Sequence, residues 1–123
     1  MSLHAGRATD AAELVTDWLS YDEVAMQLRL SVVQVRRLVR ERHLVALDVP
    51  GRKGPQVPAH FVIEGQLVKG LTGTLTLLHD ARYTPEESVA WLFSMDDSLP
   101  GRPVDALREN RGTEVRRRAQ ALA

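Results

Sequence analysis

The residues that could do chemistry in this sequence are concentrated in one stretch, from Arg29 to Lys53. These 25 residues carry seven basic and two acidic side chains, a net charge of +5 (7 − 2), whereas the whole chain has 16 of each sign and no net charge. Arginine binds phosphate oxygens and can donate two hydrogen bonds to a guanine edge. The distribution of charge, rather than its total, therefore indicates a surface for nucleic acid. The basic residues are Arg29, Arg36, Arg37, Arg40, Arg42, Arg52 and Lys53.

A helix with one apolar side and one basic side is predicted for Ser31–Arg42. When Val35 is placed at the centre of the buried stripe and each residue turns the helix by about 100°, Val32, Leu38 and Val39 stay within about 60° of it. The capping residue at position 31 would begin the helix. The other side of the helix and its flanks carry Ser31, Val33, Gln34, Arg36, Arg37 and Arg40.

The residue types on this second side match the groups that duplex DNA presents. Glutamine can bind adenine through its amide, and a valine such as Val33 can contact a thymine methyl group. Free backbone N–H groups near Ser31, at the positive end of the helix dipole, would favour a phosphate. We therefore predict DNA contacts from the exposed set, with the arginines as the main donors and Gln34 and Ser31 as base or phosphate partners.

The elements predicted around this helix are those of a winged helix-turn-helix. Ser20 and Glu23 form a capping-box pattern at the start of a preceding helix, and Arg29-Leu30 is a short turn before the basic helix. After the basic helix, "HLVALDV" and "QVPAHFVI" are predicted strands joined by the turn sequence "PGRKGP". This order of elements is typical of the winged class of helix-turn-helix domains.

The predicted hairpin adds two more basic residues to the candidate site. Pro58 indicates that the second strand lies at a sheet edge, because proline cannot donate to a ladder. Arg52 and Lys53 would lie at the hairpin tip, where they could reach the DNA backbone or the minor groove.

Each of these features also has a plain structural explanation. Arginines on an exposed helix face commonly serve solubility, and Glu41 lies one turn from Arg37 and could pair with it. Hairpin tips with an Arg-Lys pair are common. It is the co-occurrence of the features, in this order and with the capping signals, that favours DNA binding.

The N-terminal residues are predicted to contribute little to the fold. Residues 1 to about 12 are small, polar and aperiodic, and a flexible tail and lead-in are predicted over residues 1–18. Leu14–Leu19 has the i, i+4 spacing of an apolar helical edge that leads into the fold. Thr9 lies two residues after Arg7 and could accept a phosphate group or simply be solvated.

The second half of the chain is predicted to be entirely helical. Gln66–Leu71 is predicted as a short helix, and the segment between Gly70 and Gly73 as a break. A buried helix then ends near Asp80. Three further helices are predicted to start at Thr84, Pro103 and Thr113.

Several segments carry a resemblance to known families. "YDEVAMQLRLSVVQVRRLVRERHLVAL" resembles the DNA-binding segment of excisionase and MerR-like regulators. "VRERHLVAL", "PQVPAHFV", "GQLVKGLTGTLTLLHDARYT", "WLF" and "RPVDALRENRGTEVRRRAQALA" resemble a small actinobacterial family of winged-helix DNA-binding proteins with a C-terminal helical domain, over about residues 20 to 122. The resemblance implies a regulator-like DNA-binding protein. It also implies a serine/threonine kinase as a partner, because some members are thought to be kinase substrates. The acceptor of the family lies in a variable tail, and Thr9 is the candidate in the tail of this chain.

The C-terminal segment allows a second interpretation. "LPGRPVDALRENRGTEVRRRAQAL" resembles the C-terminal module of a class of bacterial antitoxins, in which a glycine-containing loop and two helices bind a protein partner. The plain alternative is that the two helices close the core or pair two subunits. Arg116, Arg117 and Arg118 are consecutive, so they spread around a helix and are predicted to form a solvated helix end.

The sequence offers no arrangement typical of an enzyme, a metal site or a cofactor site. Asp96-Asp97 is a carboxylate pair in a predicted Ser/Pro/Gly loop, and no phosphate-cradling loop is recognisable. We therefore predict no catalytic residue, no metal ligand and no cofactor. The histidines lie in four separate contexts without a His or Cys at ligand spacing; they are His4, His43, His60 and His79.

The sequence thus predicts a mostly α-helical α+β protein. Residues 1–18 would be the tail, residues 19–63 the winged helix-turn-helix and residues 64–123 a C-terminal α-helical domain. The expected partner is double-stranded DNA, with a homodimer through the C-terminal helices and a kinase as further candidates. The absence of cysteine, of a signal-peptide pattern and of a long apolar run favours a cytoplasmic, nucleoid-associated protein without a membrane.

Overall fold

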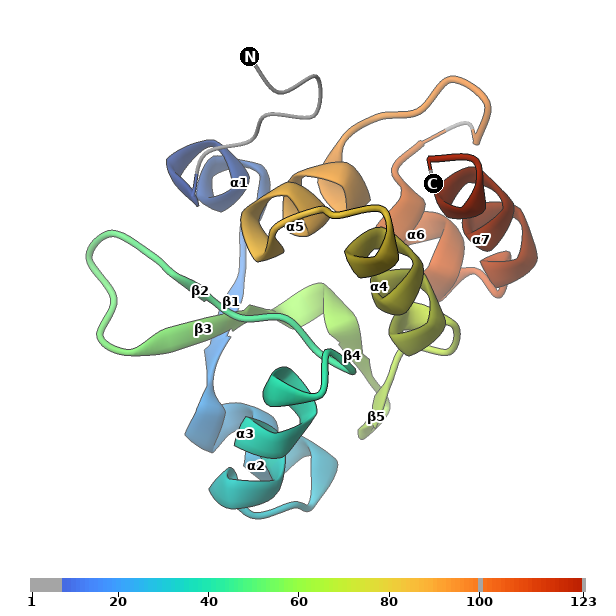
Figure 1. The fold of residues 1–123 in the computed structure, drawn as a ribbon. Helices are drawn as coiled ribbons and strands as arrows, with labels where there is room; N and C mark the ends of the chain where they lie inside the picture. Colours follow the sequence, from blue (N-terminus) through green and yellow to red (C-terminus); the bar gives the residue numbers. More distant parts are fainter. Residues whose placement is uncertain (1–7, 100, 123) are drawn as a thin grey trace.

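The computed structural model describes residues 8–99 and 101–122, and of residues 8–10 the backbone alone. Figure 1 shows two helices, α2 and α3, at one end of the molecule, a small sheet across the middle and the remaining helices at the other end. The elements are α1 (Ala8–Leu14), β1 (Trp18–Ser20), α2 (Tyr21–Leu28), α3 (Val32–Arg40), β2 (Leu47–Asp48), β3 (Pro55–Pro58), the 3-10 helix η1 (Ala59–Phe61), β4 (Val62–Ile63), β5 (Gln66–Leu67), α4 (Leu71–Asp80), α5 (Pro85–Phe93), α6 (Pro103–Arg108) and α7 (Gly112–Gln120).

The three-stranded sheet has the order β1-β3-β2, with both pairs antiparallel. β3 is therefore the central strand, and the prediction that Pro58 confines it to an edge is wrong. Its two prolines are the first and last residues of the strand, opposite Asp48 and Trp18. At these ends a missing N–H group interrupts no interior ladder bond, and the Ala59 N–H closes the ladder instead by donating to the Asp17 carbonyl at 2.9 Å.

The helix-turn-helix forms as its capping signals predict. Ser20 and Glu23 make a reciprocal capping box that starts α2. Arg29 ends that helix in the left-handed conformation, with φ of 57°, and its N–H donates back to the last turn. The chain then reverses over Arg29-Leu30 into α3, which packs against α2. This confirms the predicted helix, turn and capped helix.

The prediction of a flexible tail is wrong for residues 8–14, whereas the apolar residues predicted to lead into the fold, Val15, Trp18 and Leu19, are buried. Residues Ala8–Leu14 form a helix, α1, that packs against α5, with Ala11 and Val15 buried. Trp18 belongs to strand β1 rather than to a helical edge, because its neighbours on β3 supply the ladder partners. A seven-residue helix is marginal alone, so it is the packing on α5, invisible in the local sequence, that stabilises it.

The segment between the two halves also differs from its prediction. Gln66–Leu67 pairs with Val62–Ile63 as a β-hairpin, β4–β5, in place of a short helix. There is no break after Gly70, because α4 starts at Leu71 and includes Gly73. Gly70 is the N-cap with φ of 88°, a conformation that glycine adopts without strain.

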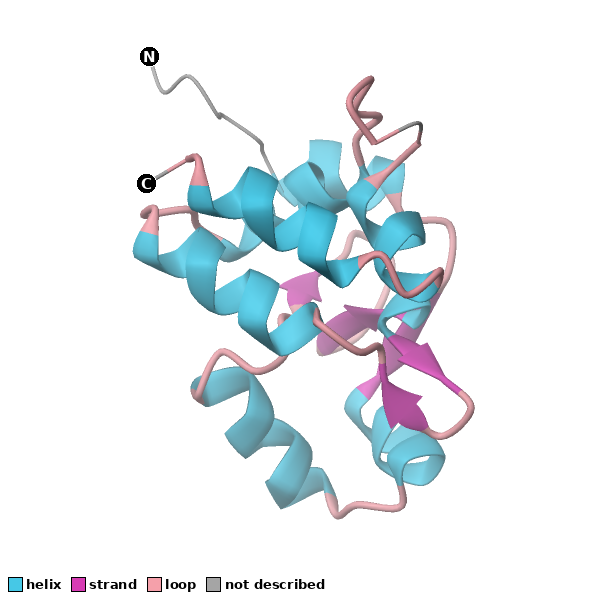
Figure 2. Ribbon diagram, turned by 90° about the vertical axis from the view of Figure 1, so that its right-hand side faces the viewer, coloured by secondary structure: helices cyan, strands magenta, loops and turns pink. Residues whose placement is uncertain are grey.

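One continuous core joins the two halves of the molecule. Phe61 of η1 and Phe93 of α5 are both buried, with ring centroids 5.8 Å apart. Arg108 of α6 donates to the carbonyls of His60 and Val62 at 2.8 and 3.3 Å. Figure 2 shows the same order of layers from the side, with the helical half resting on the strands. The winged part therefore packs directly against the helical half and shares a core with it.

Candidate nucleic-acid interface

The basic residues of helix α3 are exposed, and α3 lies with α2 at the end of the molecule opposite α1 and α5 (Figure 1). Val35 is fully buried, and Val32, Leu38 and Val39 are partly buried. The predicted apolar stripe is therefore confirmed. The exposed residues on the helix and at its N-cap are Ser31, Val33, Gln34, Arg36, Arg37 and Arg40.

The three arginines of α3 form no ion pair with any described residue. The ion pairs among the described residues all lie between side chains of α6, α7 and the residues around them. The structure does not contain the ion pair between Glu41 and Arg37 that the sequence allowed. The guanidinium groups of Arg37 and Arg40 thus keep their hydrogen-bond donors available for an external anion.

Arg36 is the arginine of α3 whose charge reaches the start of α2. Burial raises the pKa of the Tyr21 hydroxyl, while the Arg36 charge lowers it and the Asp48 charge raises it. Both charged groups therefore lie within electrostatic range of Tyr21.

The capping box at the start of α3 engages two of the predicted site residues. The Ser31 hydroxyl accepts from the Gln34 N–H at 3.1 Å, and the Gln34 Oε1 accepts from the Ser31 N–H at 2.8 Å. The Gln34 amide oxygen is occupied, so two-pronged recognition of adenine would require the box to open. Its NH₂ group and the Ser31 hydroxyl proton are still able to donate to a phosphate.

The loop between β2 and β3 is the wing, residues 49–54, and projects from the sheet to one side (Figure 1). Gly51 and Gly54 have φ of 81° and 76°, and the space around both is open. Arg52 and Lys53 between them are exposed and make no side-chain hydrogen bond within the described residues. The predicted hairpin tip is therefore in place, with both cations at its end.

The Gln56 side chain hydrogen-bonds to the backbone of the wing, a role that the sequence did not predict. It is only 3% exposed and donates from Nε2 to the carbonyls of Lys53 and Gly54 at 3.1 and 3.5 Å. A glutamine at an inward position of a strand, between Pro55 and Val57, was the signal available in the sequence.

Arg52 lies on the same side of the molecule as the start of α2. Hydrogen bonds from the Ser20 backbone and hydroxyl lower the pKa of Glu23, and the Arg52 charge lowers it further. The wing cation is thus close enough to Glu23 to act on it. We use the name basic face for the exposed cations of α3 and the wing: Arg36, Arg37, Arg40, Arg52 and Lys53.

The remaining arginine cluster does not join the basic face. Arg118 donates to the Ser98 carbonyl and hydroxyl and to the Glu114 carbonyl. Arg116 lies over Gly70 and Gly112, where α4 meets α7. Only Arg117 is fully exposed, so the predicted spread around the helix is confirmed, but the predicted solvated end is wrong for the other two.

Two further predictions concern the ends of the chain. Thr9 falls within α1, but its side chain lies outside the described residues, so its phosphorylation stays a prediction. Val115 and Ala119 of α7 are buried within the chain, so a homodimer would have to use a different face of the C-terminal helices.

The described residues contain no group of three or more His, Asp or Glu side chains that could hold a metal ion. In the same part of the chain, every helix is too short or too polar to cross a membrane.

Comparison with known proteins places this geometry in a family. Residues 7–62 match the family model described as "DNA-binding protein Rv2175c, wHTH domain", and residues 68–123 match "Rv2175c C-terminal domain of unknown function". The chain is 42% identical over 119 residues to the DNA-binding protein Rv2175c of Mycobacterium tuberculosis (strain ATCC 25618 / H37Rv), covering 85% of this chain and 80% of that protein. It also matches the NMR structure of Rv2175c with a TM-score of 0.77 and 40% identity, over 87% of this chain and 81% of that one. The chain therefore belongs to the Rv2175c family, whose members combine a winged helix-turn-helix DNA-binding domain with a C-terminal helical domain.

Proposed function

We propose that this protein binds double-stranded DNA with α3 in the major groove and the wing against the adjacent backbone, and that it regulates transcription. The observation that carries the proposal is the exposure of Arg36, Arg37 and Arg40 on one helix, without ion-pair partners among the described residues. The likeness to a protein named for DNA binding supports it.

The residues of the basic face would divide between base and phosphate contacts. Arg37 and Arg40 face away from the core stripe, and one guanidinium group can donate twice to a guanine edge. Val33 is 62% exposed and would contact a thymine methyl. Ser31 and Gln34 would bind phosphate through their free donors, because the capping box keeps the rest of their groups engaged.

The wing cations would bind phosphate rather than bases. Arg52 and Lys53 lie on a two-glycine loop outside the sheet, where Gln56 holds the backbone carbonyls of Lys53 and Gly54 while both cationic side chains are exposed. A long cationic side chain at a loop tip that binds phosphate gives affinity without sequence information. Such a contact is lost steadily as salt concentration rises.

The test is a comparison of two triple variants of equal charge. Arg36/Arg37/Arg40→Ala removes the basic face of α3, and Lys69/Arg82/Arg117→Ala removes three exposed cations elsewhere. Duplex binding is measured by fluorescence anisotropy at fixed salt, with sequences first selected from a random duplex pool. We expect at least about a tenfold loss for the α3 variant and little change for its control. Equal affinity of the wild type and the α3 variant would overturn the proposal.

A partner-binding role for the C-terminal helices has no comparable support. The loop before α6 is held by Arg118 and by Arg111, whose Nη2 donates to the Leu99 carbonyl at 3.0 Å. The apolar residues of α6 and α7 face the core. The geometry of this module is accounted for by closing the fold.

A further inference from the structure

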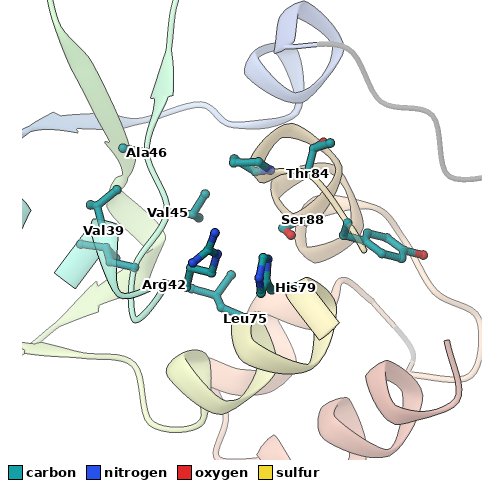
Figure 3. A pocket seen from close by; sticks show the side chains of 11 residues that line it. Val39, Arg42, Val45, Ala46, Leu75, His79, Thr84 and Ser88 are labelled. Atoms are coloured by element: carbon teal, nitrogen blue, oxygen red, sulfur yellow. The ribbon is translucent and has the colours of Figure 1, made fainter. Parts of the chain in front are cut away.

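A cavity lies between the end of α3 and the helical half of the molecule. Its volume is about 280 Å³, and its eleven lining residues come from α3, the segment after it, α4, the turn after α4 and the start of α5. Figure 3 shows these side chains converging from the two halves of the chain. A space of this size, close to the lower end of the range for small-molecule pockets, suits a compound with one or two rings.

Ser88 gives the first sign of an occupant. The residue is 5% exposed, and its hydroxyl forms no hydrogen bond with any described residue, although it lines the cavity. In Figure 3 its oxygen lies on the cavity side of α5. The hydroxyl oxygen is not among the buried polar atoms without a partner in the described residues, so it is open to the cavity and can donate to an acceptor bound there.

Arg42 gives the cavity its positive charge, and His79 lies beside it. Arg42 follows α3 in the left-handed conformation, with φ of 62°, and its guanidinium group points toward the cavity beside His79 of α4 (Figure 3). Arg42 has no ion-pair partner among the described residues, and none of the eleven lining residues is acidic. A permanent cation without a counter-ion, above apolar walls, fits an anion with an apolar body.

The walls of the cavity are fixed by backbone contacts. The His43 N–H donates to the Leu38 carbonyl at 2.9 Å, which closes the turn after α3. The Thr72 hydroxyl of α4 donates to the His43 carbonyl at 3.1 Å. The turn that carries Arg42 is therefore attached to α3 on one side and to α4 on the other.

We propose that this cavity binds a small aromatic carboxylate. Its ring would pack against Val39, Leu44 and Leu75, because a rigid ring buries much apolar area at a small entropic cost. Its carboxylate would accept hydrogen bonds from Arg42, His79 and the Ser88 hydroxyl.

Occupancy of the cavity would be coupled to DNA binding, a step that rests on the proposed function. The ligand contacts the last turn of α3 through Val39 and the helical half through Leu75. A bound ligand would therefore favour one position of α3 relative to the helical half. Any effect of the ligand on DNA affinity must be matched by an equal effect of DNA on ligand affinity.

The binding step is tested without DNA, by NMR titration of the full chain with 2-naphthoate and with the uncharged 2-naphthylmethanol. We expect naphthoate to shift the amide signals of the lining residues and to bind at least about tenfold more tightly than the alcohol. No binding, equal binding of the two compounds or shifts confined to another surface would overturn the proposal.

Two pairs of variants test the assigned contacts. Arg42→Gln should weaken naphthoate binding about tenfold. Arg82→Gln should leave it unchanged; Arg82 is a matched control because it too follows a helix in the left-handed conformation, with φ of 69°, and lies outside the cavity lining. Ser88→Ala should weaken binding several-fold, whereas Ser94→Ala, at the other end of α5, should not. Equal effects of the two arginine variants would refute the carboxylate contact.

The coupling is measured as the duplex affinity with and without saturating naphthoate. A change in affinity that disappears in Arg42→Gln supports the coupling, and an unchanged affinity refutes it. Naphthoate binding by a chain that does not bind duplex DNA would defeat the proposed function while leaving the cavity assignment intact. DNA binding by a chain that does not bind naphthoate would defeat the cavity assignment while leaving the proposed function intact.

Discussion

The arginines of this chain fall into two groups according to what their guanidinium groups contact. One group is bound internally: Arg102 pairs with Asp105 at 2.8 Å and lies 5.5 Å from the Phe93 ring centroid, and Arg108 donates to two backbone carbonyls of the winged part. The other group, which includes Arg37 and Arg40, has no such contacts among the described residues. Residue type alone therefore says little about the role of an arginine here, and its partners decide it.

Replacing Arg37 by Ala is expected to weaken binding to a selected duplex by about 1–3 kcal/mol and to relax specificity at one base position, because Arg37 projects from the centre of the exposed side of α3. Titrations against the selected sequence and single-base variants of it would measure this. Arg82→Ala serves as the control. A uniform small loss across all duplexes would instead assign Arg37 to a phosphate.

His60 is expected to make stability depend on pH. Burial, with a smaller contribution from the charges of Arg102 and Arg108, lowers its pKa in the folded protein below the ordinary value of 6.5, and its Nδ1 is buried without a hydrogen-bond partner. Between pH 6.5 and the lower pKa of the folded protein, His60 binds a proton in the unfolded chain but not in the folded one. The free energy of unfolding therefore decreases as the pH falls through this range.

Urea unfolding at a series of pH values around and below neutrality would measure this dependence. His60→Phe, which keeps an aromatic ring beside Phe93, should flatten the slope in that window. The same slope in the wild type and the variant would show that another group is responsible.

At the scale of elements, two glycines decide how closely the helical half can pack. Gly70 caps α4 and Gly112 begins α7, and α4 and α7 make the most extensive contact between helices of the described chain. A Cβ atom on Gly70 would meet Leu107 Cδ2 at 3.2 Å and the Gly112 Cα at 3.6 Å. The absence of side chains at this junction therefore lets the two helices approach.

Gly70→Ala and Gly73→Ala are expected to change stability in opposite directions, although the two sites are three residues apart. Gly70 has φ of 88° and crowded surroundings, so alanine should reduce the free energy of unfolding by about 1–3 kcal/mol. Gly73 lies inside α4 with its nearest neighbour at an ordinary 3.5 Å, so alanine should raise it by about 0.4–1 kcal/mol. Urea unfolding measures both, and equal signs would contradict this account of the junction.

At the scale of the whole molecule, function depends on where charge lies rather than on how much there is. The chain is neutral, with sixteen charges of each sign, yet α3 and the wing expose five cations between residues 36 and 53. The acidic residues of α6 and α7 are partly used to pair arginines of the same region. A neutral molecule with one basic face should bind duplex in one orientation and with a modest dependence on salt.

Arg52/Lys53→Ala is expected to reduce the slope of log affinity against log salt concentration by about one to two, since each lost phosphate contact removes about 0.9 from the slope for duplex DNA. Specificity among duplexes should not change. Titrations at several salt concentrations would show it, with Lys69/Arg82→Ala as the charge-matched control. An unchanged slope would place the wing away from the DNA.

The sequence by itself determined the helix-turn-helix and the face it exposes. Capping residues act within one turn, and helical periodicity is local, so Ser20, Ser31 and Val35 could be assigned from their neighbours alone. The turn chemistry of the wing is equally local. These features could be predicted because no distant residue is needed to specify them.

Only the tertiary structure decided the rest. β1 exists because Val57 of β3 lies beside Leu19, α1 is stabilised by α5, and Gln66–Leu67 pairs with Val62–Ile63 instead of forming a helix. The position of Arg42 over a cavity and the burial of Gln56 likewise depend on contacts between segments. Short segments have weak intrinsic preferences, so partners that are remote in the chain determine which structure they adopt.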